Sequence, residues 1–182
     1  MTRSRLALFI PLLLFVGIAI FMAVNLGQPQ QKVIRSQMIG KPVPAFNLPS
    51  LADGAPGLAR SDLAAGNGPA IVNIFASWCL PCAVEAPHLQ TLATAAGGKG
   101  VPLYGIAVQD APEDTNAFLG RYGNPYARVA TDTGGQMMVA LGASGVPETY
   151  IVDGKGIIRH QHLGDIKDSD VPRLLAQLEA AR

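Results

Sequence analysis

The two cysteines of the chain lie close together, in residues 78–82 (Trp-Cys-Leu-Pro-Cys). Residues 70–75 before them form an apolar run that is typical of a buried strand, and residues 83–96 after them form a helix-like run. The N-terminus of a helix offers unpaired N–H groups and the positive end of the helix dipole, which both stabilise a thiolate. Because the thiolate is the nucleophile in disulfide exchange, the pattern predicts a redox-active pair at Cys79 and Cys82.

Other roles for two cysteines fit less well. A disulfide with two residues between its partners closes a small loop, so it would add little stability. A zinc site needs more ligands, and the three histidines show no ligand spacing toward the pair. A copper chaperone also uses two spaced thiols, usually with a His or Met ligand nearby, but the nearest histidine, His88, lies beyond Pro87. We therefore expect no metal and no cofactor besides the Cys79–Cys82 disulfide, with copper carriage as an alternative.

The length and charge of the chain limit its class. A chain of 182 residues allows one domain and an anchor, and a net charge of +1 gives no sign of a nucleic-acid partner. Residues 6–24 form an apolar run without a charged group, and the length of this run is near that of a membrane-spanning helix. A cleaved signal peptide usually has a shorter apolar core, and residues 25–29 lack a clear Ala-x-Ala site. We expect a retained anchor over residues 1–27.

The charges beside this segment suggest its orientation. Arg3 and Arg5 lie close to one end, whereas Lys32, Arg35 and Lys41 lie farther from the other. We therefore expect a cytoplasmic N-terminus and a single-pass protein of the inner membrane whose main domain faces the periplasm. This compartment is oxidising.

The rest of the chain reads as a polar linker, residues 28–44, and one domain, residues 45–182. Short strands are expected at residues 45–49, within the turn-rich residues 54–68 and at 128–130, and further strands at 70–75, 102–109, 149–152 and 156–162. Helices are expected from Cys79 to Gly97 with a kink at Pro87, and at 111–122, 136–141 and 172–181. Alternating strands and helices that end in a hairpin predict an α/β fold, with a mixed sheet covered on both faces.

A strand followed by Trp-Cys-x-Pro-Cys and a kinked helix resembles the thioredoxin superfamily. Residues 145–153 (Gly-Val-Pro-Glu-Thr-Tyr-Ile-Val-Asp) resemble its second signature, in which a cis-proline opens a strand that faces the cysteines. The resemblance implies a cis Val146–Pro147 bond, with the backbone of Val146 open to an extended client peptide. Trp78 and Pro81 would complete this substrate-binding rim.

Within that superfamily the chain resembles the cytochrome c biogenesis thiol:disulfide interchange group (DsbE/CcmG-like, TlpA-like). The resemblance runs from about residue 39 to the C-terminus. It rests on Trp-Cys-x-x-Cys-x-x-Glu at residues 78–85, on Pro-Glu-Thr at residues 147–149, and on an extra helix and strand between about residues 111 and 130. The chain departs from the group at Val146, where the group has a small residue.

The resemblance implies a role for each residue of the motif. Cys79 attacks the client disulfide, and Cys82 breaks the mixed disulfide that results. Thioredoxin has a buried acid at the position of Asn73, so we expect Glu85, together with Glu148, to accept the proton of Cys82. Acids near the pair also raise thiol pKa values, which argues against a strong oxidant.

The group further implies a reductant that acts in cytochrome c maturation. Its client would be the Cys-x-x-Cys-His disulfide of apocytochrome c, reduced directly or through a maturation partner, and its electrons would come from a transmembrane thiol reductase. A general periplasmic thioredoxin-like reductant of several clients is the alternative. A peroxidase fits poorly, because such enzymes place a Thr where Ala76 precedes Cys79.

Overall fold

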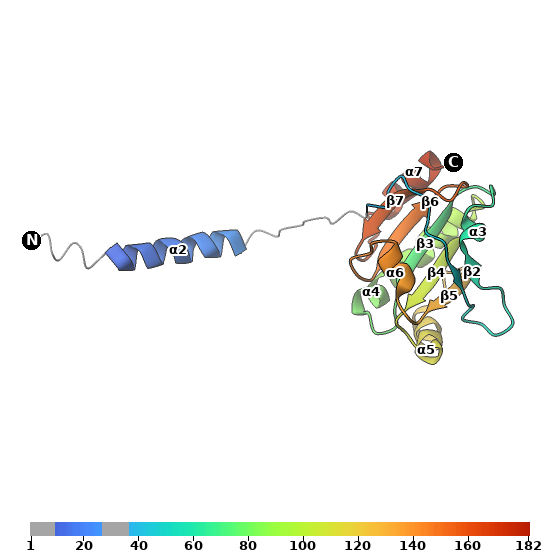
Figure 1. The fold of residues 1–182 in the computed structure, drawn as a ribbon, viewed down its shortest axis with the longest axis horizontal. Coiled ribbons are helices and arrows are strands. Elements are labelled where there is room, and N and C mark those ends of the chain that lie inside the picture. The colour runs from blue at the N-terminus through green and yellow to red at the C-terminus, as the bar shows by residue number, and fades with distance from the viewer. Residues whose placement is uncertain (1–9, 27–36) are drawn as a thin grey trace, which may run out of the picture. The chain divides into compact units, whose positions relative to one another are not determined.

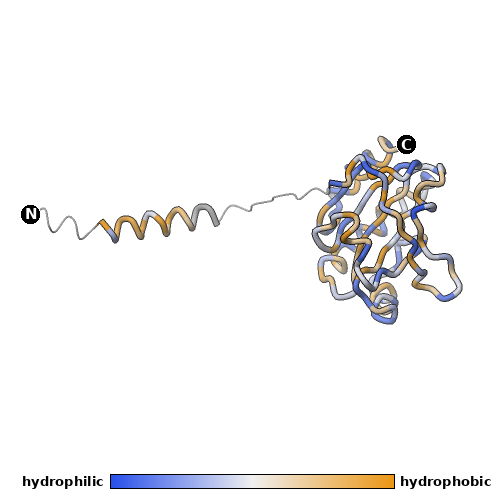
Figure 2. Tube along the Cα trace, viewed as in Figure 1, coloured by the Kyte–Doolittle hydropathy of each residue, from blue (hydrophilic) through white to orange (hydrophobic). Residues whose placement is uncertain are grey.

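The computed structural model describes residues 10–26 and 37–182. The chain divides into two compact units, residues 1–33 and residues 34–182. Within the first unit, helix α2 (Ile10–Leu26) is apolar, and its large side chains between residues 10 and 22 are exposed; Figure 2 shows their hydropathy. Residues 6–9 of the expected membrane span lie outside the described residues. Among the residues described, no helix combines the length and the apolar character that crossing a membrane requires.

The second unit is built on a mixed five-stranded sheet in the order β5-β4-β3-β6-β7 (Figure 1). β3, β4 and β5 run parallel, β6 runs antiparallel to β3, and β7 runs antiparallel to β6. The strands are β3 (Ala70–Phe75), β4 (Leu103–Val108), β5 (Arg128–Asp132), β6 (Glu148–Val152) and β7 (Ile158–Leu163). The predicted mixed α/β sheet with a terminal hairpin is confirmed.

Helices cover both faces of this sheet. One face packs against α4 (Leu80–Gly97), α5 (Pro112–Tyr122) and α7 (Val171–Ala180). The other face packs against residues from around the hairpin of β1 (Asn47–Leu48) and β2 (Leu58–Ala59), from α3 (Arg60–Leu63) and from α6 (Gln136–Ala140). We refer to these as the α4 face and the α6 face. Because β3 lies between two covered faces, all six of its residues are buried.

The alternation of side chains along β3 decides which of its residues lie on the α4 face and which on the α6 face. Ile71 and Phe75 of β3 pack on the α4 face, and Val72 and Ile74 pack on the α6 face. Asn73 therefore projects toward α4, where it is the polar residue of an otherwise apolar strand. Asn73 therefore places a buried polar side chain on the α4 face, where it needs hydrogen-bond partners.

Helix α4 begins directly after the first cysteine. Cys79 is its N-cap, and Pro81 lies in the first turn, where a missing N–H costs nothing. Leu89, Leu92 and Ala96 are buried on one side, as the helical period predicts. The helix continues through Pro87 as one element.

Two segments differ from the expectation. Residues 40–43 were assigned to the linker, yet the N–H of Gly40 bonds to the carbonyl of Ile158 and the N–H of Val43 to that of Gly156 (2.8 Å each). Val43 is buried in the core of the α6 face. Residues 28–36 of the expected linker lie outside the described residues. The four-residue helix α3 was not predicted, because the Gly- and Ala-rich sequence around it carries no helical period.

Candidate active site

Cys79 and Cys82 form a disulfide at the N-terminus of α4, with their Cα atoms 5.3 Å apart. Both residues are buried, with exposed fractions of 4% and 2%, so exposure hardly distinguishes them. Their hydrogen bonding does, because the N–H of Cys82 donates to Sγ of Cys79 at 3.1 Å. An N–H directed at this sulfur would also stabilise a Cys79 thiolate, together with the helix dipole.

The β4–α5 turn holds the loop that leads into the cysteines. The carboxylate of Asp110 accepts hydrogen bonds from the N–H and the hydroxyl of Ser77 (2.7 Å each) and from the hydroxyl of Thr115 (3.0 Å). Nε1 of Trp78 donates to the carbonyl of Gln109 at 3.1 Å. The indole is fixed at one edge while 60% of the residue is exposed. Trp78 is therefore a surface residue beside the disulfide and not part of the core.

An apolar rim surrounds the disulfide. Trp78, Leu80 and Val84 expose large side chains near the start of α4. Val146 is half-buried and packs against the cluster that contains both cysteines. The Val146–Pro147 bond is cis, as predicted. Of the residues predicted to bind substrate, Trp78 and Pro81 thus belong to the cysteine motif itself, and Val146 packs against the cysteine cluster from a distant part of the sequence.

Glu85 lies one turn beyond Cys82 on α4 and is completely buried. Its Oε1 accepts a hydrogen bond from Nδ2 of Asn73 (3.1 Å), and its Oε2 accepts one from the N–H of Ile166 (3.0 Å). Burial removes the carboxylate from water and raises the pKa of Glu85 to about 7. The two hydrogen bonds oppose this effect, and the negative charge of Asp165 adds to it. Glu85 therefore gains and loses a proton near neutral pH.

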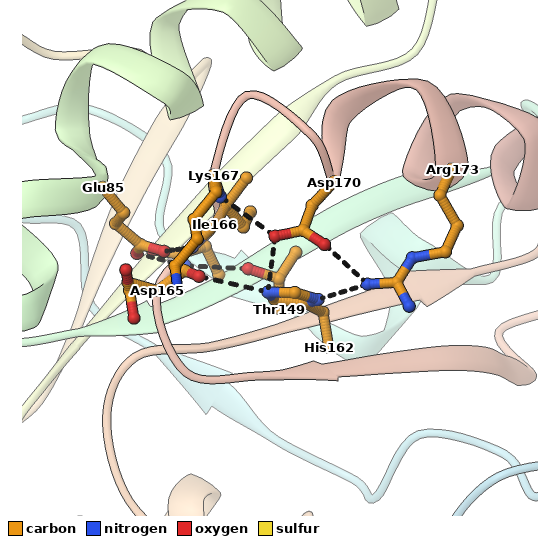
Figure 3. A network of polar contacts seen from close by, with 9 residues as sticks. Glu85, Thr149, His162, Asp165, Ile166, Lys167, Asp170 and Arg173 are labelled. Atoms are coloured by element: carbon orange, nitrogen blue, oxygen red, sulfur yellow. Dashed lines mark hydrogen bonds and ion pairs between the residues drawn. The ribbon is translucent and has the colours of Figure 1, made fainter.

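The loop between β7 and α7 joins Glu85 to the cis-proline. The N–H of Gly164 donates to the carbonyl of Pro147 at 3.0 Å, and two residues later the N–H of Ile166 reaches Glu85. Figure 3 shows Glu85 directed at this loop. Beside it lies a polar network in which Asp170 lies 2.8 Å from Arg173 and 3.9 Å from His162. One loop thus contacts both the strand that would meet a client and the acid beside Cys82.

Glu148 differs from the expectation. Neighbouring residues of a strand point to opposite faces, and the hydroxyl of Thr149 accepts a hydrogen bond from Asn73 on the α4 face. Glu148 therefore lies on the α6 face, with Tyr150. The structure does not bring its carboxylate to the side of the sheet on which Glu85 lies, so the pairing of these two acids is corrected.

Donors from the α6 face surround Glu148. Its carboxylate accepts four hydrogen bonds, from the N–H and hydroxyl of Ser144 (2.7 Å each), the hydroxyl of Tyr150 (2.6 Å) and the side-chain amide of Gln161 (2.9 Å). Burial, and then the hydrogen bond to Glu148, raise the pKa of the Tyr150 hydroxyl above its ordinary value. These contacts tie the segment before Pro147 to the sheet, which is a supporting role.

Three partners of this site were not foreseen from the sequence. The hydroxyl of Tyr126 donates to Oδ1 of Asn73 at 2.7 Å, and Thr149 and the backbone of Ile166 complete the contacts of Asn73 and Glu85. An amide in an apolar strand does signal that buried polar partners must exist. The sequence does not say which residues supply them, because these residues are far from Asn73 along the chain.

The arrangement fits thiol–disulfide exchange. It offers a cysteine at a helix N-terminus, a second cysteine one turn away, and a buried acid on the following turn that titrates near neutral pH. Within residues 10–26 and 37–182, no group of three or more His, Cys, Asp or Glu side chains has an arrangement that could hold a metal ion.

Comparison with known proteins gives the same class. The Redoxin family pattern matches residues 38–178. The chain is 39% identical over 165 residues to the thiol:disulfide interchange protein DsbE of Pseudomonas fluorescens, covering 91% of this chain and 88% of that protein. It is 34% identical over 167 residues to DsbE of Escherichia coli K12, covering 90% and 88%. A DsbE-type crystal structure from Chlorobium tepidum superposes with a TM-score of 0.68 at 26% identity, over 79% of this chain and 96% of that one.

Proposed function

The chain belongs to the Redoxin family and, within it, to the DsbE-type thiol:disulfide interchange proteins, and from this we propose that it serves as a reductant in cytochrome c maturation. Its activity is that of a protein-disulfide reductase. The single observation that carries the proposal is the buried Glu85 on the turn after the Cys79–Cys82 pair, because a proton acceptor beside the resolving thiol suits the release of a reduced client.

The reaction would begin with the dithiol form of the protein. The Cys79 thiolate, stabilised by the N–H of Cys82 and the helix dipole, attacks one sulfur of the client disulfide. A Cys79–client disulfide forms, and the other client sulfur leaves as a thiolate. Cys82 then gives its proton to the Glu85 carboxylate and attacks Sγ of Cys79. The bond between Cys79 and the client breaks, the second client sulfur leaves as a thiolate, and the Cys79–Cys82 disulfide forms, so two electrons have passed to the client. The client thiolates then take up protons, one of which Glu85 can return.

The raised pKa of Glu85 suits this step. A carboxylate of ordinary acidity would rarely take a proton from a thiol, whereas a group with a pKa of about 7 can both accept and release one at neutral pH. Because desolvation in the core is the main cause of the shift, the acid depends on remaining enclosed by Asn73 and the β7–α7 loop.

The proposed client is the Cys-x-x-Cys-His segment of apocytochrome c, or a maturation protein that carries its electrons. The apolar rim of Trp78, Leu80 and Val146 would contact the client, and the backbone of Val146 would pair with it as an extended peptide. We further propose that residues 6–24 anchor the protein in the inner membrane with the domain in the periplasm, where a transmembrane thiol reductase would supply electrons.

The client can be trapped with the full-length chain. Cys82→Ser cannot resolve the mixed disulfide, so clients should remain bound to Cys79 and be recovered from non-reducing gels, whereas Cys79→Ser should recover none. Trapped apocytochrome c or a cytochrome maturation protein supports the proposal. A set of unrelated periplasmic proteins without either of these would instead favour a general reductant.

The direction of electron flow is a separate test. The reduction potential of the Cys79–Cys82 pair can be measured by equilibration with glutathione. A value near or below that of thioredoxin, about −270 mV, supports a reductant, whereas a value near about −120 mV would make the protein a disulfide donor and overturn the proposal.

A further inference from the structure

The amide of Asn73 lies at the centre of a buried set of hydrogen bonds. Its Nδ2 donates to Oε1 of Glu85 at 3.1 Å and to the hydroxyl of Thr149 at 3.0 Å, and its Oδ1 accepts from the hydroxyl of Tyr126 at 2.7 Å. Asn73 and Thr149 are opposite each other in the β3–β6 pair, and both are completely buried. Water therefore cannot replace any of these contacts at low cost.

The two ends of this amide are not interchangeable. Both hydrogens of Nδ2 are used, one by Glu85 and one by Thr149, and Oδ1 is left for a donor. If the amide were turned over, Oδ1 would face the carboxylate of Glu85, and two acceptors would meet. The Glu85 carboxylate, which can only accept, therefore sets the orientation of the amide, and the Tyr126 hydroxyl completes that orientation by donating to Oδ1.

The position of Tyr126 is itself fixed. Its ring stacks on Phe75 with centroids 5.0 Å apart and an interplanar angle of 20°. Gly105 of β4 lies under the ring, so close that a Cβ there would come within 2.9 Å of it. The N–H of Tyr126 donates to Oδ1 of Asn124 at 3.0 Å. Because the ring is held on several sides, its hydroxyl is fixed in place beside Asn73.

We propose that Tyr126 is a positioning residue of the active site, which acts on Glu85 through Asn73. Its hydroxyl holds Oδ1 of Asn73 in place and polarises the amide, and the amide then donates a stronger hydrogen bond to Glu85. The inference rests on the proposed role of Glu85 as the proton acceptor of Cys82, and it adds a residue from outside the cysteine motif and the cis-proline segment. Tyr126 is proposed to act through Asn73 and Glu85 and takes no part in the exchange at the sulfur atoms.

The expected effect has a definite sign. The hydrogen bond from Asn73 lowers the pKa of Glu85, against the larger effect of burial. Removing the Tyr126 hydroxyl weakens this hydrogen bond and leaves Oδ1 of Asn73 without its donor, so the pKa of Glu85 should rise. The other titratable or charged groups around Glu85 come from α4, from the β7–α7 loop and from the network beside it: Cys82, His88, Asp165, Asp168, His162, Asp170 and Arg173. Tyr126→Phe changes none of them.

The test is a titration of the Glu85 carboxyl in the oxidised full-length protein, followed by carbon NMR. Tyr126→Phe keeps the ring on Phe75 and removes only the hydroxyl. We expect its Glu85 midpoint to lie about half a pH unit above that of the wild type, which is about threefold in the ratio of neutral to ionised carboxyl. Tyr122→Phe is the matched control, since the Tyr122 ring packs against Phe118 on α5, and it should leave the midpoint unchanged. Equal midpoints in all three proteins would overturn the proposal.

A second measurement separates positioning from general loosening of the fold. The pH profile of disulfide reduction with a small disulfide substrate should move to higher pH in Tyr126→Phe. In a Glu85→Gln background, Tyr126→Phe should have no further effect on that profile, whereas a shift that persists there would contradict an action through Glu85. Neither measurement uses a cytochrome, so a failed client trap and a failed positioning role give different results.

Discussion

Glu85 combines complete burial with hydrogen-bond donors that favour its charged form. The effect of burial is the larger, because the pKa rises to about 7 in spite of those donors. Between its ordinary pKa of 4.5 and about 7, the folded protein holds this proton while the unfolded chain has released it. The native state therefore binds more protons than the unfolded state over this range, and its stability falls as the pH rises.

We predict that this single group lowers the free energy of unfolding of the oxidised protein by about 3 kcal/mol from pH 4.5 to pH 7.5. Glu85→Gln removes the titration, so the stability difference between the two proteins should change by that amount over the range. Urea denaturation at several pH values measures it. The glutamine also turns an N–H toward a donor, which costs stability at every pH but adds no slope. If the two proteins depend on pH in the same way, Glu85 does not titrate in this window.

At the scale of elements, the ring of Tyr126 packs so closely on β4 that it restricts which residue the strand can hold at position 105. Gly105 lies inside the strand, where glycine normally weakens pairing. Here a Cβ would come within 2.9 Å of the Tyr126 ring and 3.0 Å of the Phe75 ring. The small residue is thus required by the close approach of Tyr126, which the hydrogen bond to Asn73 needs.

Gly105→Ala should destabilise the protein by about 1–3 kcal/mol, because the core must shift to admit the methyl group. The matched control is Gly120→Ala in α5, where no atom lies within 4 Å of the new Cβ. That change should stabilise the protein by about 0.5–1 kcal/mol, since alanine favours a helix over glycine. Thermal denaturation of both variants provides the comparison. Equal shifts in the two would mean that Tyr126 does not restrict the space at Gly105.

These elements also show what sequence reasoning can and cannot reach. The apolar run of β3, the helix after Cys79 and the hairpin of β6 and β7 carry local periods and turn signals, so their types were predicted and their ends lie within two residues or so. The pairing of residues 40–43 beside β7 depends on contacts more than a hundred residues apart, and no local signal marks it. The face on which Glu148 lies follows from strand register, which the sequence does not specify here.

The same limit applies to the site. Cys79 caps the N-terminus of α4 and Cys82 and Glu85 lie in its first turns, so their spacing alone brings the three together. The environment that raises the pKa of Glu85 comes from β3 and the β7–α7 loop, and Tyr126 comes from the segment before β5. A motif thus predicts which groups react, whereas the fold sets the protonation state in which they do so.

At the scale of the whole molecule, the proposed reductant needs a source of electrons. Because the proposed source is a transmembrane thiol reductase, the function depends on whether the N-terminal unit holds the protein in the membrane. Helix α2 spans 17 residues, which corresponds to about 25 Å at 1.5 Å per residue and is short of a hydrocarbon core of about 30 Å. The apolar sequence begins before α2, at Leu6, so the run over residues 6–24 comes closer to that thickness. Large side chains of α2, such as Leu14 and Phe15, are exposed, and exposed apolar side chains of this size are stable in lipid.

We predict that the full-length protein stays with the membrane fraction after carbonate extraction. Arginine near the centre of a membrane helix costs about 3 kcal/mol, so Leu14→Arg together with Phe15→Arg should release the protein, while Leu14→Ile together with Phe15→Leu should not. The released variant should still reduce a small disulfide, because the Cys79–Cys82 pair and Glu85 belong to the other unit. Mass spectrometry of the wild type decides the remaining alternative. A mature chain found outside the membrane and lacking residues 1 to about 25 would mean that the segment is a cleaved signal peptide, and the domain would then have to meet its electron donor by diffusion.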